Sequence, residues 1–305
     1  MSSVEDYTYD VSEPDFSKKL SIICPVSDMA GRLDLLQQWL SRVDFKSTQV
    51  IIVHDKRDEN TGIELRSIIS RIDSPGLTLQ EGFFGTAAGA RNSALANCEG
   101  EWICFWDSDD QPNYELLIKS LDSSYDVVIG EFFIEIPTGL ITRVKHGSND
   151  EQSLSRVSFN PGLWRMAFQS KVIKHLSFPE IVMGEDQCFL AQLNWNSLKT
   201  KYSGEVFYTY FSGWHTQTTG QGKSRLPLVL SLRFLQQLLE KKTGKVEFIR
   251  NMASRQFLTL FKSRGFKVKI LAIIELAKLF NRPMGFFKQI KSLMEMAFYL
   301  VKSRS

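Results

Sequence analysis

The chain has 305 residues, of which 43% are apolar and 23% charged, and its formal net charge is +3. This length and composition support one domain of ~200–250 residues with an appendage, and a soluble core that needs no disulfides. The four cysteines include no CxxC pair, so we expect buried free thiols in a reducing cytosol.

The N-terminal segment, residues 1–17, is polar and acidic. It lacks the basic and apolar regions of a secretory signal, so we expect a flexible segment in a cytoplasmic protein. No window of about 18 residues along the chain is free of charge, which predicts that no helix crosses a membrane.

Between residues 20 and 110, apolar runs typical of strands alternate with stretches of helical periodicity. The expected strands are 20–26, 50–53, 77–79 and 102–106, and the expected helices are 32–43, 62–72 and a third that follows the small-residue loop 85–90. Pro112 suits the first turn of a further helix. This order predicts an α/β fold in which helices flank both faces of a mostly parallel sheet.

Polar side chains follow three of these strands, at the points where the strands end. They are Ser27-Asp28, His54-Asp55 and Asp107–Asp110. Ligands bind at the carboxyl ends of the strands in such a sheet. We therefore expect these residues to converge on one site.

The pattern changes after residue 125. Apolar runs at 132–136 and 140–144 flank the turn sequence Pro137-Thr-Gly139, which predicts a hairpin. Beyond residue 225, helical spacing of apolar residues predicts helices at 228–239, 248–261, 268–280 and 286–301.

The charge reverses near residue 222. Residues 223–305 hold 18 Lys/Arg against four Asp/Glu, whereas residues 1–222 hold 19 against 30. The reversal indicates a main domain over 18–222 and a basic C-terminal helical region over 223–305.

Asp107 and Asp109 are separated by one residue directly after an apolar strand. Two carboxylates in this arrangement can reach one divalent ion, and their hard oxygen atoms suit Mg²⁺ or Mn²⁺ bound to a diphosphate. The alternative is an ordinary acidic turn that caps the next helix. These residues alone leave both interpretations open.

Glu185 and Asp186 form a second acidic motif, at the start of an amphipathic stretch. Acids are favoured in the first turn of a helix by its dipole, so simple capping explains them. Combined with a metal-binding pair, however, an acid at this position would supply a general base.

Four segments, in this order, resemble the motifs of family 2 glycosyltransferases. They are IICPV at 22–26, GARNSAL at 89–95, GEWICFWDSDD at 100–110 and GED at 184–186. The resemblance covers roughly residues 18–215. It implies a GT-A fold, a nucleoside-diphosphate sugar donor with UDP as the expected nucleotide, a Mn²⁺ or Mg²⁺ ion, and inversion at the anomeric carbon.

Carried over residue by residue, the resemblance implies that Asp107 and Asp109 bind the metal, with Asp109 as the more direct ligand. Asp186 matches the catalytic base, and Glu185 beside it is the alternative. Arg91 matches a residue near the nucleobase and diphosphate. The positions that match those holding the base and ribose of the donor are Pro25, Val26 and Asp55.

The sequence also departs from the family pattern. The second strand ends in His54-Asp55-Lys56-Arg57, where the family usually has two acids followed by Gly-Ser, which leaves the nucleobase open. The QxxRW motif and spanning helices of processive members are not found. We therefore expect transfer of one sugar to a glycan or lipid-linked glycan, as in bacterial surface polysaccharide synthesis.

Two further residues have alternative interpretations. His215 lies in a region from which some family members use a histidine on the metal or diphosphate, and it otherwise is a loop histidine without a role. Trp164 either stacks on an acceptor sugar or belongs to the core.

Two rival functions are a sugar nucleotidyltransferase and an inactive glycosyltransferase-like scaffold. The first needs an N-terminal Gly-rich loop with Arg and Lys for a triphosphate, and residues 25–31 contain none. The second would lack the base or the metal pair, and both are present.

The basic C-terminal region predicts peripheral binding to an anionic membrane at its inner face, because basic amphipathic helices bind such surfaces. The alternative is that these helices pack on the main domain or form an oligomer interface. No nucleic-acid-binding motif accompanies the basic charge, so nucleic acid is not an expected partner.

Overall fold

The structure is a computed structural model that describes residues 16–147, 153–213, 226–241 and 244–261, together with 269–271, 273–275, 291 and 294. Most of the predicted N-terminal segment 1–17 and most of the last two predicted helices lie outside these residues. Within the described ranges, no helix combines the length and the apolar character needed to cross a bilayer.

The first half of the chain alternates strands and helices as predicted. Its elements are β1 (Lys18–Val26), α1 (Asp34–Leu40), β2 (Thr48–Asp55), α2 (Glu59–Ile72), β3 (Leu77–Gly82), α3 (Ala87–Leu95) and β4 (Gly100–Phe105). The four strands are parallel and lie in the order β3-β2-β1-β4. Every residue of β2 is buried, which is typical of a parallel strand covered on both faces.

The second half extends this sheet with antiparallel and parallel neighbours. Its elements are β5 (Gln111–Pro112), α4 (Tyr114–Ser120), β6 (Val127–Glu135), β7 (Ile141–Val144), α5 (Ser153–Phe159), the 3-10 turn η1 (Leu163–Arg165), β8 (Met166–Gln169), α6 (Ser170–Ile173), α7 (Glu185–Ala191) and β9 (Thr200–Phe211). The order continues β4-β8-β6-β9-β5, with β7 beside β6. Neither β8 nor β9 was predicted from the sequence.

The predicted hairpin is confirmed, and the predicted role of Pro112 is wrong. Phe132 of β6 lies opposite Val144 of β7 in an antiparallel register. Pro112 instead belongs to β5, where it pairs with Tyr208 of β9. The following helix begins at Tyr114, because the side chain of Asn113 caps it by accepting a hydrogen bond from the backbone NH of Leu116.

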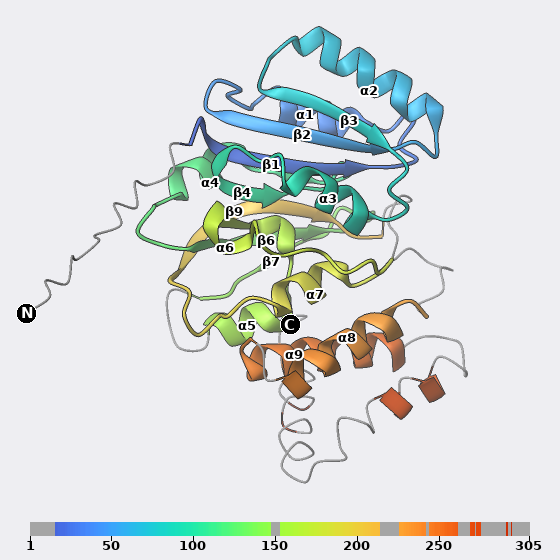
Figure 1. Cartoon of the computed structure of the whole chain (residues 1–305), viewed down its shortest axis with the longest axis vertical. Coiled ribbons are helices and arrows are strands. Elements are labelled where there is room, and N and C mark those ends of the chain that lie inside the picture. Colours follow the sequence, from blue (N-terminus) through green and yellow to red (C-terminus); the bar gives the residue numbers. More distant parts are fainter. Residues whose placement is uncertain are drawn as a thin grey trace, which may run out of the picture.

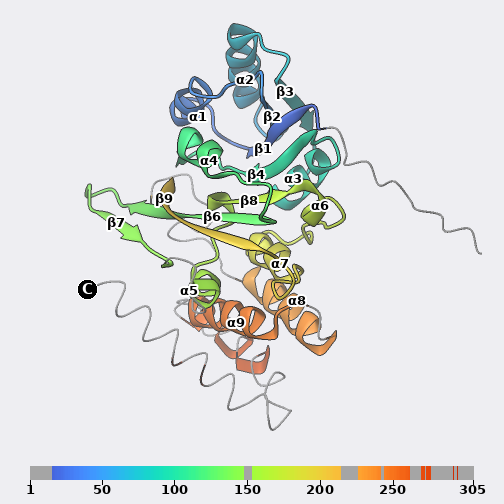
Figure 2. The same ribbon diagram turned by 90° about the vertical axis from the view of Figure 1, so that its left-hand side faces the viewer.

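Helices cover both faces of the sheet (Figures 1 and 2). On one face, α1, α2 and α4 pack with alternate β1 residues such as Ile22 and Cys24. On the other face, α3 and α7 share a core with Ile23 and Phe105. The alternation of β1 side chains between these two cores follows from the two-residue repeat of a strand. All four cysteines are free and buried, as predicted.

The C-terminal helices α8 (Leu228–Lys241) and α9 (Val246–Phe261) pack against the α7 face. They lie below the sheet in Figure 1, beside α5 and α7. Leu232 of α8 and Met252 of α9 are fully buried in the same core as α7. The alternative that the basic region packs on the main domain therefore holds for α8 and α9.

Candidate active site

A pocket of about 890 Å³ opens where β1, β2 and β4 end. Its size suits a substrate rather than a single ion. Pro25, Val26, Asp28 and Asp55 line it together with the acidic loop Asp107–Asp110. The convergence predicted from strand ends is therefore confirmed for these residues.

His54 does not share this position, although it precedes Asp55. Its ring is fully buried. Nδ1 lies 3.3 Å from a carboxylate oxygen of Glu81, and Nε2 lies 3.2 Å from the backbone oxygen of Asp58. His54 therefore supports the end of β2 from outside the pocket.

The acidic loop crowds carboxyl groups into a partly buried space. Burial raises the pKa of Asp107, the Arg91 charge lowers it, and the Asp109 charge raises it further. Burial and the charges of Asp109 and Asp107 raise the pKa of Asp110 well above its usual value. A positive charge bound nearby would therefore stabilise the ionised form of each of these acids.

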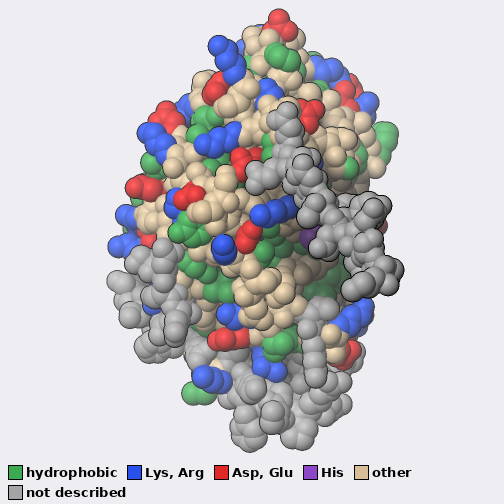
Figure 3. Space-filling view, turned by 60° about the vertical axis from the view of Figure 1, so that its left-hand side comes forward, with side chains coloured by type: hydrophobic (Ala, Val, Ile, Leu, Met, Phe, Trp, Pro, Cys, Tyr) green, Lys and Arg blue, Asp and Glu red, His purple; other side chains and the backbone are tan. Residues whose placement is uncertain are grey.

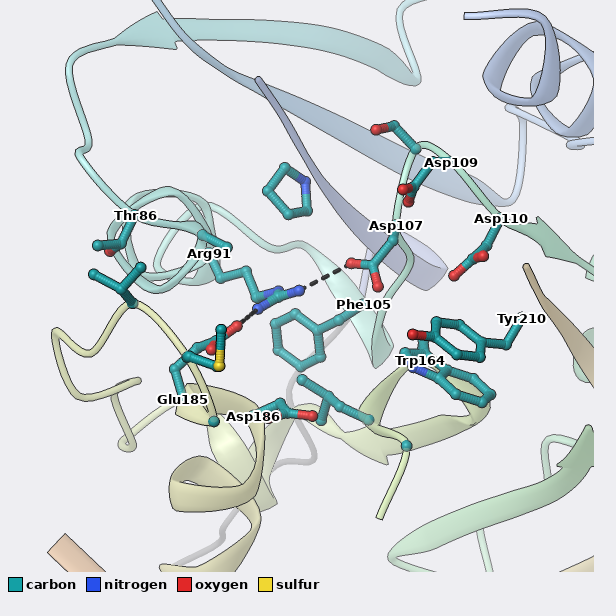
Figure 4. Close-up of a pocket in the computed structure, with 18 of the residues that line it drawn as sticks. Thr86, Arg91, Phe105, Asp107, Asp109, Asp110, Trp164, Glu185, Asp186 and Tyr210 are labelled. Atoms are coloured by element: carbon teal, nitrogen blue, oxygen red, sulfur yellow. Dashed lines mark hydrogen bonds and ion pairs between the residues drawn. The ribbon is translucent and has the colours of Figure 1, made fainter. Parts of the chain in front are cut away.

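Arg91 supplies part of that positive charge from α3. It is almost wholly buried and donates to Asp107 at 2.9 Å and to Glu185 at 2.8 Å. Figure 4 shows its guanidinium between these two carboxylates. Its Nε atom is buried without a hydrogen-bond partner in the part of the chain that the structure describes. Arg91 thereby ties α3, the acidic loop and the start of α7 together.

Glu185 and Asp186 are adjacent but have different surroundings. Glu185 is ion-paired with Arg91, whereas the Asp186 carboxylate accepts the backbone NH of Gln187 at 2.8 Å. Burial and the Glu185 charge raise the pKa of Asp186 to about 7. A carboxyl group with this pKa can accept a proton near neutral pH.

Gly184 sets the position of these acids at the start of α7. Its backbone adopts a left-handed conformation, with φ of 82°. A Cβ at this position would lie 2.7 Å from the Ser231 hydroxyl of α8. Glycine is therefore required both for the turn and for the close approach of the two helices.

Asp55, at the end of β2, has defined hydrogen-bond and ion-pair partners. One carboxylate oxygen accepts the backbone NH of Phe84 at 3.1 Å, and the other pairs with Nε of Arg57 at 2.9 Å. Pro25 and Val26 border the same region. The three residues that the resemblance assigns to base and ribose are therefore neighbours in one pocket.

Trp164 lies on the pocket wall rather than wholly in the core. Its ring stacks on Tyr208, with centroids 4.4 Å apart, and on Tyr210, with centroids 5.6 Å apart. Figure 4 shows Trp164 and Tyr210 facing each other below Asp110. The result is an aromatic surface beside the acids.

The contribution of α9 to the pocket was not predicted from the sequence. Arg255, Gln256 and Thr259 line the pocket from this helix. Gln256 is buried, accepts a hydrogen bond from Ser231 at 3.0 Å, and lies 3.3 Å from the Gln187 side chain. The i, i+1, i+4 spacing of these polar residues indicates that they share one face of a helix. Only the packing of α9 shows that this face meets the pocket.

The site also meets the requirements of a divalent cation only in part. Among the described residues, no three His, Cys, Asp or Glu side chains converge as a complete set of metal ligands. His215 lies outside the described residues. The mutually repelling oxygen donors of Asp107 and Asp109 nonetheless fit Mg²⁺ or Mn²⁺, which bind one or two carboxylates and take further ligands from substrate phosphates.

Comparison with known proteins agrees with this geometry. The model of a family described as "Glycosyl transferase family 2" matches residues 33–189, about half of the chain. Glycosyltransferase GlyA of Streptococcus pneumoniae is 24% identical over 212 residues, which cover 63% of this chain and 30% of that protein. This chain thus corresponds to about a third of the length of GlyA.

A second relative matches over most of its length. The GalNAc(5)-diNAcBac-PP-undecaprenol beta-1,3-glucosyltransferase of Campylobacter jejuni is 22% identical over 233 residues, which cover 73% of this chain and 75% of that protein.

A solved structure shares the fold. S. aureus TarS in complex with UDP-GlcNAc matches with a TM-score of 0.64 and 17% identity, over 92% of this chain and 81% of that chain. Similarity at this identity establishes the fold alone. The predicted GT-A fold, with C-terminal helices, is therefore confirmed.

The raised pKa of Asp186 predicts a specific dependence of stability on pH. An unfolded aspartate has a pKa of about 3.9, whereas the folded value is about 7. Between these values the folded state keeps a proton that the unfolded state releases, so stability falls as the pH rises through this window. We expect Asp186→Asn to raise the melting temperature most at about pH 8, less at about pH 5, and hardly at all below about pH 4, where both states keep the proton.

Asp44→Asn provides a control of opposite sign. The hydroxyl of Ser47 and the backbone NH of Lys46 lower the pKa of Asp44. Its substitution should therefore remove stability at neutral pH rather than add it. A melting-temperature difference between wild type and Asp186→Asn that stays constant with pH would contradict the raised pKa.

Proposed function

The chain belongs to glycosyl transferase family 2, and from this membership and the pocket geometry we propose that it transfers one sugar, with inversion, from a nucleoside-diphosphate sugar to an acceptor hydroxyl. The observation that carries the proposal is the position of Asp186, a carboxyl group with a pKa of about 7, in the same pocket as Arg91 and the acidic loop. In this proposal, a proton acceptor lies beside groups suited to a diphosphate.

The proposed donor is UDP-linked. TarS, which shares the fold, is described in complex with UDP-GlcNAc. The nucleotide would lie against Pro25, Val26 and Asp55, which border one side of the pocket. Its diphosphate would lie near Arg91 and the acidic loop, because these groups provide a guanidinium and cation-binding oxygen atoms.

The proposed cofactor is Mn²⁺ or Mg²⁺, held by Asp107 and Asp109. Such an ion, when bound, stabilises the negative charge that grows on the leaving diphosphate. From the resemblance to the family motif, we propose that Asp109 is the more direct ligand, while Asp107 also pairs with Arg91. His215 stays a candidate ligand that the described residues do not test.

Asp186 acts as the general base in this proposal. As the acceptor oxygen forms its bond to the anomeric carbon, its proton passes to the Asp186 carboxylate, and the bond between that carbon and the diphosphate oxygen breaks. Attack from the face opposite the leaving group inverts the anomeric configuration. Glu185 instead fixes Arg91 through the 2.8 Å ion pair, so its effect on the reaction is indirect.

The proposed acceptor is a glycan or lipid-linked glycan of bacterial surface polysaccharide synthesis. The name of the Campylobacter relative includes a lipid-linked glycan as its acceptor. Trp164 offers an aromatic face for a sugar ring, and Gln256 adds a polar group on the α9 side. Gln256 lies close to the proposed base, because its side chain is 3.3 Å from that of Gln187, the residue after Asp186.

We also propose that the chain acts at the cytoplasmic face of a membrane. On the face drawn in Figure 3, described acidic and basic side chains are interspersed. The support for membrane contact is the charge of residues 262–305, which hold ten Lys/Arg against two Asp/Glu. Flotation with anionic but not neutral liposomes at low salt is the expected result. A chain that stays in the soluble fraction with both would remove this proposal.

The proposed activity predicts metal-dependent turnover of a nucleotide sugar. A panel of UDP-, GDP- and TDP-sugars is incubated with the protein, with Mn²⁺ and with a chelator, and released nucleotide is measured. We expect one donor to be hydrolysed or transferred only with Mn²⁺.

Asp109→Ala should abolish this turnover without lowering the melting temperature, because the side chain lies at a strand end rather than in the core. Equal turnover in the variant would show that the cation binds elsewhere.

Asp186→Asn is expected to keep donor binding and to lose transfer by roughly 10²–10⁴-fold, because the amide cannot accept the proton. In the wild type, kcat should rise with pH up to about pH 7, as the Asp186 carboxyl ionises. Calorimetry measures nucleotide affinity, and a coupled assay measures kcat across pH.

Glu185→Gln is the matched comparison at the neighbouring position. It removes the charge that pairs with Arg91 and that helps to raise the pKa of Asp186. Because Asp186 remains, kcat should still rise with pH, but at a lower pH than in the wild type and to a reduced plateau. Near wild-type transfer by Asp186→Asn, together with loss of the pH dependence in Glu185→Gln, would transfer the role of base to Glu185.

A further inference from the structure

Tyr208 of β9 contacts both ends of the acidic loop. Its side chain is fully buried. Its hydroxyl accepts a hydrogen bond from the backbone NH of Asp107 at 3.1 Å and also donates to the carboxyl group of Asp110. One hydroxyl group therefore fixes the first and last residues of the loop.

The same loop is attached to β9 through a second set of contacts. The Asp110 carboxylate accepts the backbone NH of Phe211 at 2.9 Å. Immediately after the loop, Gln111 and Pro112 pair with Thr209 and Tyr208 in an antiparallel register. Asp109 lies between these fixed ends and lines the pocket.

Tyr208 also supports the pocket wall, because its ring stacks on Trp164 with centroids 4.4 Å apart. β9 begins at residue 200, after the stretch 33–189 that the family model matches. The support for the acidic loop therefore comes from a part of the chain that the family motifs do not include.

We propose that Tyr208 is a positioning residue that sets the spacing of Asp107 and Asp109 for a divalent cation and the donor diphosphate. This inference rests on the proposed function, because it assigns the acidic loop to that cation. Metal-binding carboxylates depend on outer hydrogen-bond partners to hold their orientation. A hydroxyl that accepts from one end of the loop and donates to the other provides such a partner.

The test measures binding of UDP by calorimetry, with and without Mn²⁺, to the wild type and to Tyr208→Phe. The phenylalanine keeps the ring that stacks on Trp164 and removes only the hydroxyl. We expect the Mn²⁺-dependent part of UDP binding to weaken by about 10- to 100-fold. Binding of UDP without Mn²⁺ should change by less than about twofold, because the nucleotide contacts at Asp55 and Val26 are intact.

Tyr114→Phe is the matched control. Tyr114, at the start of α4, is also a buried tyrosine. Its hydroxyl lies 2.9 Å from the hydroxyl of Thr48 in β2 and not against the acidic loop. It should lower the melting temperature as much as Tyr208→Phe and leave Mn²⁺-dependent binding unchanged. Equal effects of the two variants on binding would overturn the positioning role.

The outcomes also separate this inference from the proposed function. A wild type that gains UDP affinity with Mn²⁺, combined with an unaffected Tyr208→Phe, contradicts only the role of Tyr208. A wild type that binds UDP in neither condition contradicts the UDP-linked donor and, with it, the role of Tyr208.

Discussion

The ion pairs of Arg91 are the constraint on which the rest of the pocket depends. One buried guanidinium contacts the carboxylates of Asp107 and Glu185, which come from separate parts of the chain. Burying a charge is costly unless it is paired, and removing one partner leaves the others uncompensated. Arg91 therefore holds α3, the acidic loop and α7 in a common position, and this position defines the pocket.

The same pairing separates the roles of two adjacent acids. Arg91 forms an ion pair with Glu185. Asp186 instead is buried next to the Glu185 charge, and both effects raise its pKa to about 7. Two carboxyl groups with different environments can take different tasks in one reaction. The proposed base and the proposed tether thus follow from one asymmetric contact, although the sequence places the two acids side by side.

Much of the first half of the fold was predictable because its strands are continuous apolar runs that are buried on both faces, as in β2. The polar residues after those runs mark the edge of the sheet, so Asp55 and Asp107 could be placed without a structure. β9 could not be predicted in this way. Its residues are mostly intermediate or exposed, and its pairing with β6 is non-local and interrupted by a bulge. Local periodicity carries little information about such a strand.

The parts that escaped prediction build one particular side of the pocket. β9 supplies Tyr208 and Tyr210, and α9 supplies Gln256, all beyond the residues matched by the family model. They reach the site through tertiary packing, with α9 hydrogen-bonded to α8 through Ser231. The proposed donor side instead uses strand ends and one Arg on α3, which short motifs can encode. Short motifs therefore predict the proposed donor side better than the proposed acceptor side, because the latter is assembled from segments whose meeting only the complete fold determines.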